Sequence, residues 1–237
     1  MTLFLAASVL PPLYLLWKVY QSDKIEKEPP RLLLTIFLFG MLSTLPAGIL
    51  ETIGQVVLVS VFHLNPETGS GGGTVFNLVF YFLVVGGAEE LVKFYAMKIP
   101  TWRSRDFDYV FDGVVYGVTS ALGFATLENI LYVMDSGLLT AGVRAWTAIP
   151  LHCIAGIFMG HFYGIAKAAD LWNDKGVRRK MMRRSILFPL LIHGAYDFIA
   201  ASENEILTLF FFVYIVILDI VAIRALKRYA GRDVSLY

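Results

Sequence analysis

Long apolar runs dominate this chain of 237 residues and constrain its fold more than any other feature. Hydrophobic residues make up 57% of it, which is more apolar surface than one soluble core of this size could bury. A helix needs about 20 apolar residues to cross a bilayer. The sequence therefore predicts an all-α, multi-pass membrane helix bundle with about seven spans, at residues 3–20, 32–62, 75–98, 109–134, 139–168, 185–201 and 206–226.

The basic residues predict how this bundle is oriented. They cluster within residues 18–31, 93–105, 167–184 and 224–232, so that they fall on alternate sides of successive predicted spans, and Arg144 alone departs from this pattern. Lys and Arg concentrate in cytoplasmic loops. We therefore expect the N-terminus outside, the C-terminus in the cytoplasm, and the polar loop that precedes the third span outside.

Short connectors predict a single membrane-embedded domain over residues 1–237, with the functional motifs between about 75 and 201. No basic segment precedes the first apolar run, so we expect it to be retained as an anchor. The basic cluster at 178–184 is expected to set topology and to contact anionic lipids, without a nucleic-acid partner. The one cysteine, Cys153, can form no internal disulfide and is expected to be a small buried side chain.

Small residues recur at four-residue spacing in two predicted spans. They are Gly113, Gly117 and Ala121 in the fourth span, and Gly156, Gly160 and Gly164 in the fifth. Small residues at this spacing let helices approach closely. His152 lies four residues before Gly156, so it shares that face and is expected to point into a helix interface.

Six ionisable side chains lie inside the apolar runs, where a charge is expensive to keep. They are Glu89, Glu90, Glu128, His152, His193 and Asp197. A charge at the centre of a membrane helix costs on the order of 2.5 to 3.5 kcal/mol, so such residues normally face the bundle interior or a watery cavity. Four predicted helices contribute to this set, which we predict to be the functional site.

Glu89, Glu90 and Lys93 form the first candidate motif. On a helix Lys93 lies one turn beyond both carboxylates and can pair with either, which leaves one carboxylate over. Two adjacent acids cannot both be ionised cheaply in a low-dielectric site, so one paired and one proton-exchanging carboxylate is a typical acid/base design. The alternative is an inert ion-pair cluster at the membrane interface.

The other candidate residues lie on three later spans. Glu128 has no basic residue within one helical turn, so its partner must come from another helix, a metal or a water-filled cleft; the adjacent Asn129 could simply bridge helices. His193 and Asp197 are four residues apart on one face, where the aspartate can orient the imidazole. For His152 a purely structural hydrogen bond remains the alternative.

Two protease classes are excluded by their motifs. The chain has no His-Glu-x-x-His zinc motif, and the Tyr196-Asp197 pair has no Gly-x-Gly-Asp partner for an aspartyl dyad. Carboxylates and histidines remain. Such a set can hold a zinc ion with an open position for water, or can activate water directly through a glutamate.

At these residues the chain resembles the PrsW family of intramembrane proteases, within the superfamily that includes the CAAX prenyl endopeptidases and bacteriocin-processing proteins. The matching motifs occur in order: Glu89-Glu90-Leu-Val-Lys93, then Phe111-Asp112-Gly113 with Phe124 to Asn129, then His152 with the glycines after it, and finally His193 to Asp197. In the prenyl endopeptidases a histidine stands at the position of Glu128, so a simple two-histidine zinc site would need His152 as its second nitrogen.

The resemblance implies hydrolysis of a membrane-anchored protein, typically the site-1 cleavage of a single-span anti-sigma factor in a stress response. It implies that Glu89 or Glu90, helped by Glu128 and His152, activates water, and that His193 backed by Asp197 stabilises the oxyanion. If zinc is used, its ligands would come from Glu89, Glu128, His152 and His193.

Two other functions remain open from the sequence. A proton- or cation-coupled transporter would also carry midplane acids and histidines, but it predicts pseudo-symmetric halves that we do not find in the sequence. A non-catalytic membrane scaffold would bind partners through its glycine stripes, and it predicts that Glu90 and His193 are dispensable.

Overall fold

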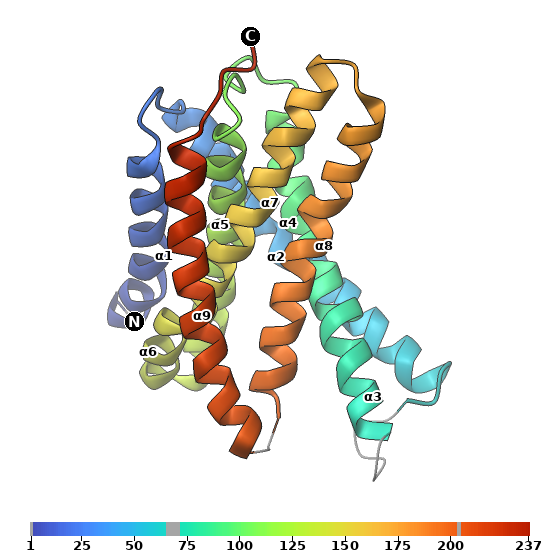
Figure 1. Cartoon of the computed structure of the whole chain (residues 1–237). Coiled ribbons are helices and arrows are strands. Elements are labelled where there is room, and N and C mark those ends of the chain that lie inside the picture. The colour runs from blue at the N-terminus through green and yellow to red at the C-terminus, as the bar shows by residue number, and fades with distance from the viewer. Residues whose placement is uncertain (1, 65–71, 203–204) are drawn as a thin grey trace.

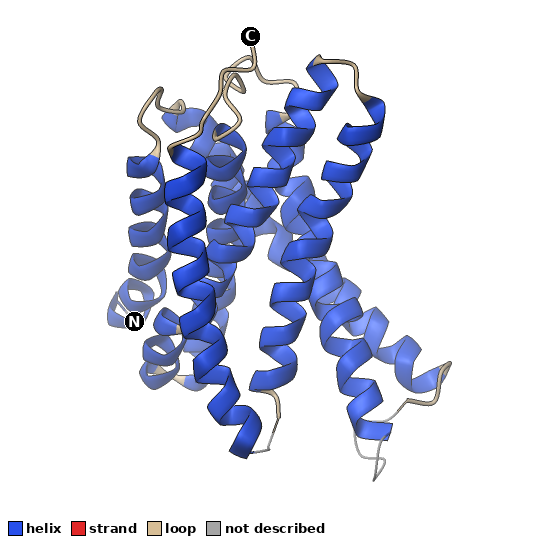
Figure 2. Cartoon of the chain, viewed as in Figure 1, coloured by secondary structure: helices blue, strands red, loops and turns tan. Residues whose placement is uncertain are grey.

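The computed structural model describes residues 2–64, 72–202 and 205–237, so most of the predicted exterior loop, residues 65–71, lies outside the described residues. Apart from an isolated bridge between Tyr109 and Ser235, the regular structure of these residues is helical, which confirms the all-α class (Figure 2). The elements are α1 (Thr2–Ser22), α2 (Pro30–Ser60), α3 (Gly72–Val79), the π-helix η1 (Phe80–Val85), α4 (Gly86–Thr101), α5 (Asp112–Ser136), α6 (Leu138–Trp146), α7 (Ala148–Leu171), α8 (Lys175–Ala200) and α9 (Glu205–Ala230).

Six helical segments of the described chain are long and apolar enough to cross a membrane, which confirms the multi-pass architecture. The predicted span at 185–201 is the second half of α8, whose first half is basic, so α8 as a whole is not among the six. This helix nevertheless packs along α7 and α4 (Figure 1). The orientation of the bundle stays a prediction.

Three predicted spans differ in detail from the helices observed. The span at 75–98 contains a π-helical stretch, and the span at 139–168 is divided into α6 and α7 at Thr147, whose φ of −124° and ψ of −74° are not helical. Helix α8 begins ten residues before its predicted span, because the Asp174 side chain accepts a hydrogen bond from the Val177 amide and caps a polar first half. A prediction from hydropathy marks only the apolar part of a helix, so it missed the polar first half of α8.

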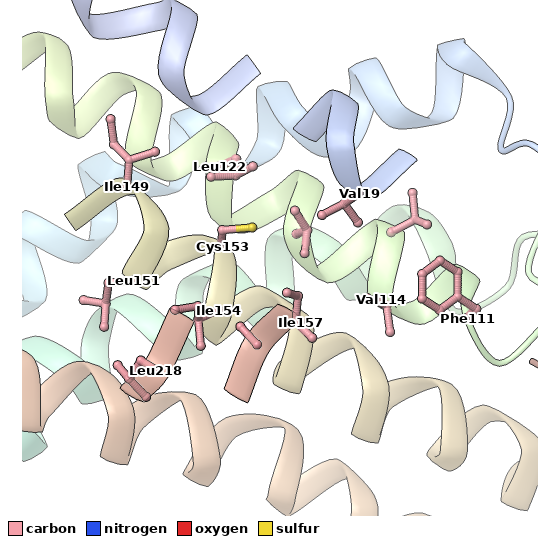
Figure 3. Packing of buried hydrophobic residues seen from close by; sticks show 13 residues of the cluster. Val19, Phe111, Val114, Leu122, Ile149, Leu151, Cys153, Ile154, Ile157 and Leu218 are labelled. Carbon is pink, nitrogen blue, oxygen red and sulfur yellow. The ribbon is translucent and has the colours of Figure 1, made fainter. Parts of the chain in front are cut away.

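Helices α5 and α7 form the centre of the bundle. Their backbones touch through the predicted glycine stripes: a Cβ on Gly117 would lie 2.4 Å from the Gly156 carbonyl oxygen, and one on Gly160 would lie 2.0 Å from that of Gly113. Figure 3 shows the apolar core beside this seam, where Cys153 lies buried as predicted. The close approach of α5 and α7 fixes the helices that carry Glu128 and His152.

The bundle opens at the end opposite the C-terminus. In Figure 1, α2 and α3 lean away from α9 toward that end. Helix α2 still packs against α5 and α4. Helix α2 therefore diverges from its neighbours toward the open end of the bundle, and it stays in contact with them nearer the end where the chain's C-terminus lies.

Candidate active site

The predicted site residues, which lie far apart in the sequence, converge between α4, α5, α7 and α8. The hydrogen-bonded pair Lys93 and His152 is separated by 59 residues, and the pair Glu90 and His193 by 103. All four of these side chains are buried. Burying any one of these charges alone would cost free energy. The tertiary structure places them in one cluster, where opposite charges pair and reduce that cost.

Two glycines bring the start of α4 against α8. A Cβ on Gly194 would lie 2.7 Å from the Phe82 ring, and one on Gly86 would lie within 3.4 Å of the α8 backbone. The π-helix η1 directly precedes Gly86, and π-helical turns are frequent at functional sites. This close approach is what lets Glu90 reach His193.

Lys93 is the centre of the cluster. Its Nζ lies 2.9 Å from Glu89 Oε2, 2.9 Å from Glu90 Oε1 and 3.0 Å from His152 Nδ1. The expectation that Lys93 would pair with only one carboxylate is wrong, because an ammonium has three N–H donors and reaches both. The charge imbalance still holds, since one cation faces two carboxylates.

His193 contacts two carboxylates through its two ring nitrogens. Nδ1 lies 2.8 Å from Glu90 Oε1, and Nε2 lies 3.3 Å from Asp197 Oδ2 and 3.7 Å from Glu89 Oε2. The predicted contact between His193 and Asp197 is present, and the shorter one to Glu90 is additional. Because an ionised carboxylate only accepts, Nδ1–H donates to Glu90 and directs the other nitrogen toward Asp197 and Glu89.

His152 links Lys93 to Glu128. Lys93 can only donate, so His152 Nδ1 accepts from it, and the Nε2–H donates to Glu128 Oε2 at 3.0 Å. The His152 and His193 rings meet edge to face with their centroids 5.1 Å apart. The two histidines therefore present their nitrogens to one shared polar space.

Glu128 finds its partners on other helices, as expected. Arg144, on α6, forms an ion pair with Glu128, and its Nε donates to Asn129 Oδ1 at 3.0 Å. Asn129 in turn donates to the Ser8 carbonyl oxygen at 3.1 Å, so it does bridge helices. In the sequence Arg144 stands out only because it departs from the alternation of basic residues, and this departure is the sequence signal for a charge with a role inside the bundle.

A cavity of about 480 Å³ opens beside the cluster. Its lining includes Glu89, Glu128, His152, His193 and Asp197, together with a residue that the sequence reasoning missed. This is Glu51 of α2, for which the described residues provide no ion pair within 4 Å. The sequence does contain a signal for Glu51, because this residue is also an ionisable side chain within an apolar run.

Four buried side chains could hold a metal ion. Glu89, Glu90, His152 and His193 each offer one ligand atom, and these atoms lie within 4.8 Å of one another. Carboxylate oxygen and imidazole nitrogen are ligands that zinc accepts. The buried Glu90 Oε2 has no hydrogen-bond partner within the described chain, which leaves an acceptor for a cation. The donor set therefore fits a metal.

This group differs from the ligand set inferred from the resemblance. The group in the structure contains Glu90, whereas the set inferred from the resemblance contains Glu128. In the structure the Glu128 carboxylate contacts Arg144 and His152 instead. Lys93 contacts three of the four side chains, so a metal ion held by them would displace its ammonium, at His152 Nδ1 above all. The carboxylates of the cluster also outnumber its permanent cations, Lys93 and Arg144, which favours an additional positive charge.

Comparison with known proteins relates the chain to one family. The model of the PrsW family intramembrane metalloproteases matches residues 28–223. Protease PrsW of Bacillus subtilis (strain 168) is 32% identical over 201 residues, covering 85% of this chain and 84% of the relative. Protease PrsW of Oceanobacillus iheyensis is 32% identical over 224 residues, covering 94% of each. No solved structure matches.

The family match covers α2 to α8 and most of α9, and it includes each residue of the buried cluster. The comparisons support the resemblance drawn from the four ordered motifs, and with it a membrane-embedded peptide hydrolase that acts on membrane proteins. The chain belongs to the PrsW family of intramembrane metalloproteases.

Proposed function

We propose that this protease cleaves a single-span membrane protein, and that the cut is the site-1 cleavage of an anti-sigma factor in stress signalling. One observation carries the proposal: the buried group of Glu89, Glu90, His152 and His193 lies beside a cavity among membrane-spanning helices. Such a cavity can admit a peptide bond of a membrane-anchored chain. The anti-sigma factor is the substrate class that the motif resemblance implies.

In the proposed reaction Glu89 is the general base. Glu89 lines the cavity, whereas Glu90 is fully buried and held by Lys93 and His193. Glu89 accepts a proton from water as the water oxygen bonds to the carbonyl carbon. It then gives that proton to the amine nitrogen as the C–N bond breaks. Glu90 is a positioning residue for Lys93 and His193.

His193 stabilises the developing oxyanion in this proposal. Its Nδ1–H is held by Glu90, so its Nε2 is directed toward Asp197 and the cavity. With a second proton on Nε2 the ring is an imidazolium, and its Nε2–H is a hydrogen-bond donor that is fixed before the reaction and stabilises developing charge without reorganisation. Glu128 plays a supporting part by fixing His152, which lines the same cavity.

We further propose that the metal is zinc, held by His152 and His193 with Glu89 or Glu90. In this zinc form His193 Nε2 would be a ligand, and the metal would take the place of His193 at the oxyanion. Zinc bound through these residues would polarise the carbonyl oxygen and lower the pKa of the attacking water. Zinc content of the purified active protein tests this directly, with about one zinc per chain expected. Full activity with zinc well below one per chain, unchanged by a chelator, would overturn the zinc proposal and leave the direct glutamate mechanism.

Cleavage of a co-expressed, tagged single-span anti-sigma factor tests the proposed function. The wild-type chain is compared with Glu89→Gln, Glu90→Gln and His193→Ala at matched membrane levels, with Glu26→Gln, an exposed loop residue, as the control. We expect the product with the wild type and the control and its loss in the three site variants. Cleavage by all forms would move the chemistry elsewhere. No cleavage by the wild type would overturn this choice of substrate.

A further inference from the structure

Helices α2 and α5 cross tightly and then diverge. At the crossing, a Cβ on Gly40 would lie 2.2 Å from the Ser120 carbonyl oxygen, and a Cβ on Gly123 would lie 2.2 Å from that of Phe37. One turn beyond Gly40 the contact is looser, because the Thr44 hydroxyl lies 3.5 Å from the Phe124 carbonyl oxygen. Past Thr44, α2 leads toward the open end of the bundle (Figure 1).

The divergence leaves an apolar groove that faces the membrane. Residues Thr44, Leu45, Gly48, Ile49, Thr52 and Ile53 of α2 and Leu131 of α5 line it. The groove measures about 480 Å³, and Ile49 on its edge is 61% exposed. Thr44, Gly48 and Leu131 also line the catalytic cavity, so the two spaces share a wall. The groove, with its exposed apolar edge, therefore adjoins the cavity whose lining includes Glu89.

Gly48 is a small residue that the fold itself does not use. A Cβ on Gly48 would meet nothing within 4 Å among the described residues, in contrast to Gly40 two turns earlier on the same helix. Thr44, Gly48 and Thr52 continue the spacing that begins at Gly40. A helix face of small residues allows close packing of a second membrane helix. The face is occupied by α5 at Gly40, whereas at Gly48 no other part of the described chain packs against it.

We propose that the transmembrane helix of the substrate docks in this groove, with a small residue opposite Gly48, and passes from it into the catalytic cavity. The proposal rests on the proposed function, because it names the docking site of the same reaction. The adjacency of the groove and the catalytic cavity favours a substrate helix over a lipid acyl chain, because only a peptide has a bond that the cavity could cleave. Its apolar walls match the side chains of a membrane span.

A pair of variants and a pair of substrates test the groove by cleavage. Ile53→Trp fills it, because Ile53 lines the groove and is not part of the catalytic cavity. Ile223→Trp is the matched control, because Ile53 and Ile223 are 54% and 55% exposed and Ile223, on α9, lines neither space. The substrates are a tagged single-span anti-sigma factor in proteoliposomes and a short soluble peptide that contains its cleaved sequence.

We expect Ile53→Trp to lower cleavage of the membrane substrate at least tenfold and to change peptide cleavage less than twofold. Ile223→Trp should leave both within twofold of the wild type. Undiminished cleavage of the membrane substrate by Ile53→Trp would overturn the proposal. Equal loss on both substrates would also overturn it, because the tryptophan would then be disturbing the catalytic cavity.

Photo-crosslinking separates this proposal from the proposed function. A benzophenone amino acid at position 49, in the Glu89→Gln background, is expected to capture the tagged single-span protein without any need for turnover. Capture combined with failure of the wild type to cleave would uphold the docking groove and refute the proposed function for that substrate. Adducts only to lipid, or only to a second copy of this chain, would assign the groove to those occupants and overturn the docking proposal.

Discussion

Glu90 Oε1 lies 2.8 Å from His193 Nδ1 and 2.9 Å from Lys93 Nζ, so one carboxylate oxygen accepts from two helices at once. The other oxygen, Oε2, is buried without a hydrogen-bond partner within the described chain. The two oxygens therefore have different tasks: Oε1 holds the cluster together, and Oε2 is available to a cation. A substitution at Glu90 can therefore keep the hydrogen bonds that stabilise the fold and remove the oxygen that is free to bind a metal.

Glu90→Gln should preserve the fold and lose the metal. The amide oxygen can still accept from Lys93 and His193, whereas the NH₂ group in place of Oε2 cannot bind a cation. We expect an unfolding temperature within a few degrees of the wild type, with bound metal and cleavage both at least about tenfold lower. Metal analysis and thermal unfolding of the same purified sample measure both effects. A variant that retained stoichiometric metal would show that Glu90 is no ligand.

Lys93→Met should destabilise the protein strongly. Lys93 is fully buried and neutralises Glu89 and Glu90, so its removal leaves two buried carboxylates without their cation. Breaking a buried pair in this way costs about 3 to 5 kcal/mol of the free energy of unfolding. Lys98→Met is the control, since Lys98 lies on the same helix outside the cluster and should change this free energy by less than about 0.5 kcal/mol. Unfolding in detergent provides the measurement; equal stability of the two variants would contradict the central role of Lys93.

Arg144 should act as a positioning residue. It contacts Glu128 and Asn129 with different nitrogens of one planar group, which a lysine cannot reproduce. We expect Arg144→Gln to lower kcat roughly 10- to 100-fold with KM unchanged, and Arg144→Lys to recover only part of the loss. Arg178→Gln, which removes a more exposed ion pair with Asp170, should leave kcat unchanged. A raised KM with normal kcat would instead place Arg144 in substrate binding.

Glu28, in the loop before α2, should make stability depend on pH. Burial raises the pKa of its carboxyl from 4.5 to about 7, although the hydrogen bond from the Tyr116 hydroxyl at 2.6 Å acts to lower it. The folded protein therefore binds this proton more tightly than the unfolded chain does. The resulting stabilisation is full below pH 4.5 and is lost as the pH rises through about 7.

Glu28→Gln should remove this contribution and raise stability at pH 8 relative to the wild type, by at most about 3 kcal/mol of the free energy of unfolding. Unfolding temperatures between pH 5 and pH 8.5 measure the difference. Glu26→Gln, at an exposed position in the same loop, should follow the wild-type curve. Parallel curves for the wild type and Glu28→Gln would show that Glu28 titrates normally.

The sequence by itself determined the bundle, the central glycine seam and the residues of the buried cluster. These follow from local physics: a run of about 20 apolar residues can cross the bilayer, and a charge within it must find a partner. The same reasoning required a partner for Glu128 beyond its own helical turn, on another helix, in a metal or in a water-filled cleft. It also paired His193 with Asp197, because four residues make one helical turn.

Only the tertiary structure decided how these residues meet. It made Lys93 the partner of both glutamates, gave Glu128 the guanidinium of Arg144, directed Glu89 rather than Glu90 toward the cavity, and added Glu51 to its lining. It also joined Glu90 to His193 across 103 positions, a contact that depends on where helices cross and how far they diverge. Helix crossing is set by packing between whole surfaces, which spacing along a single helix cannot specify.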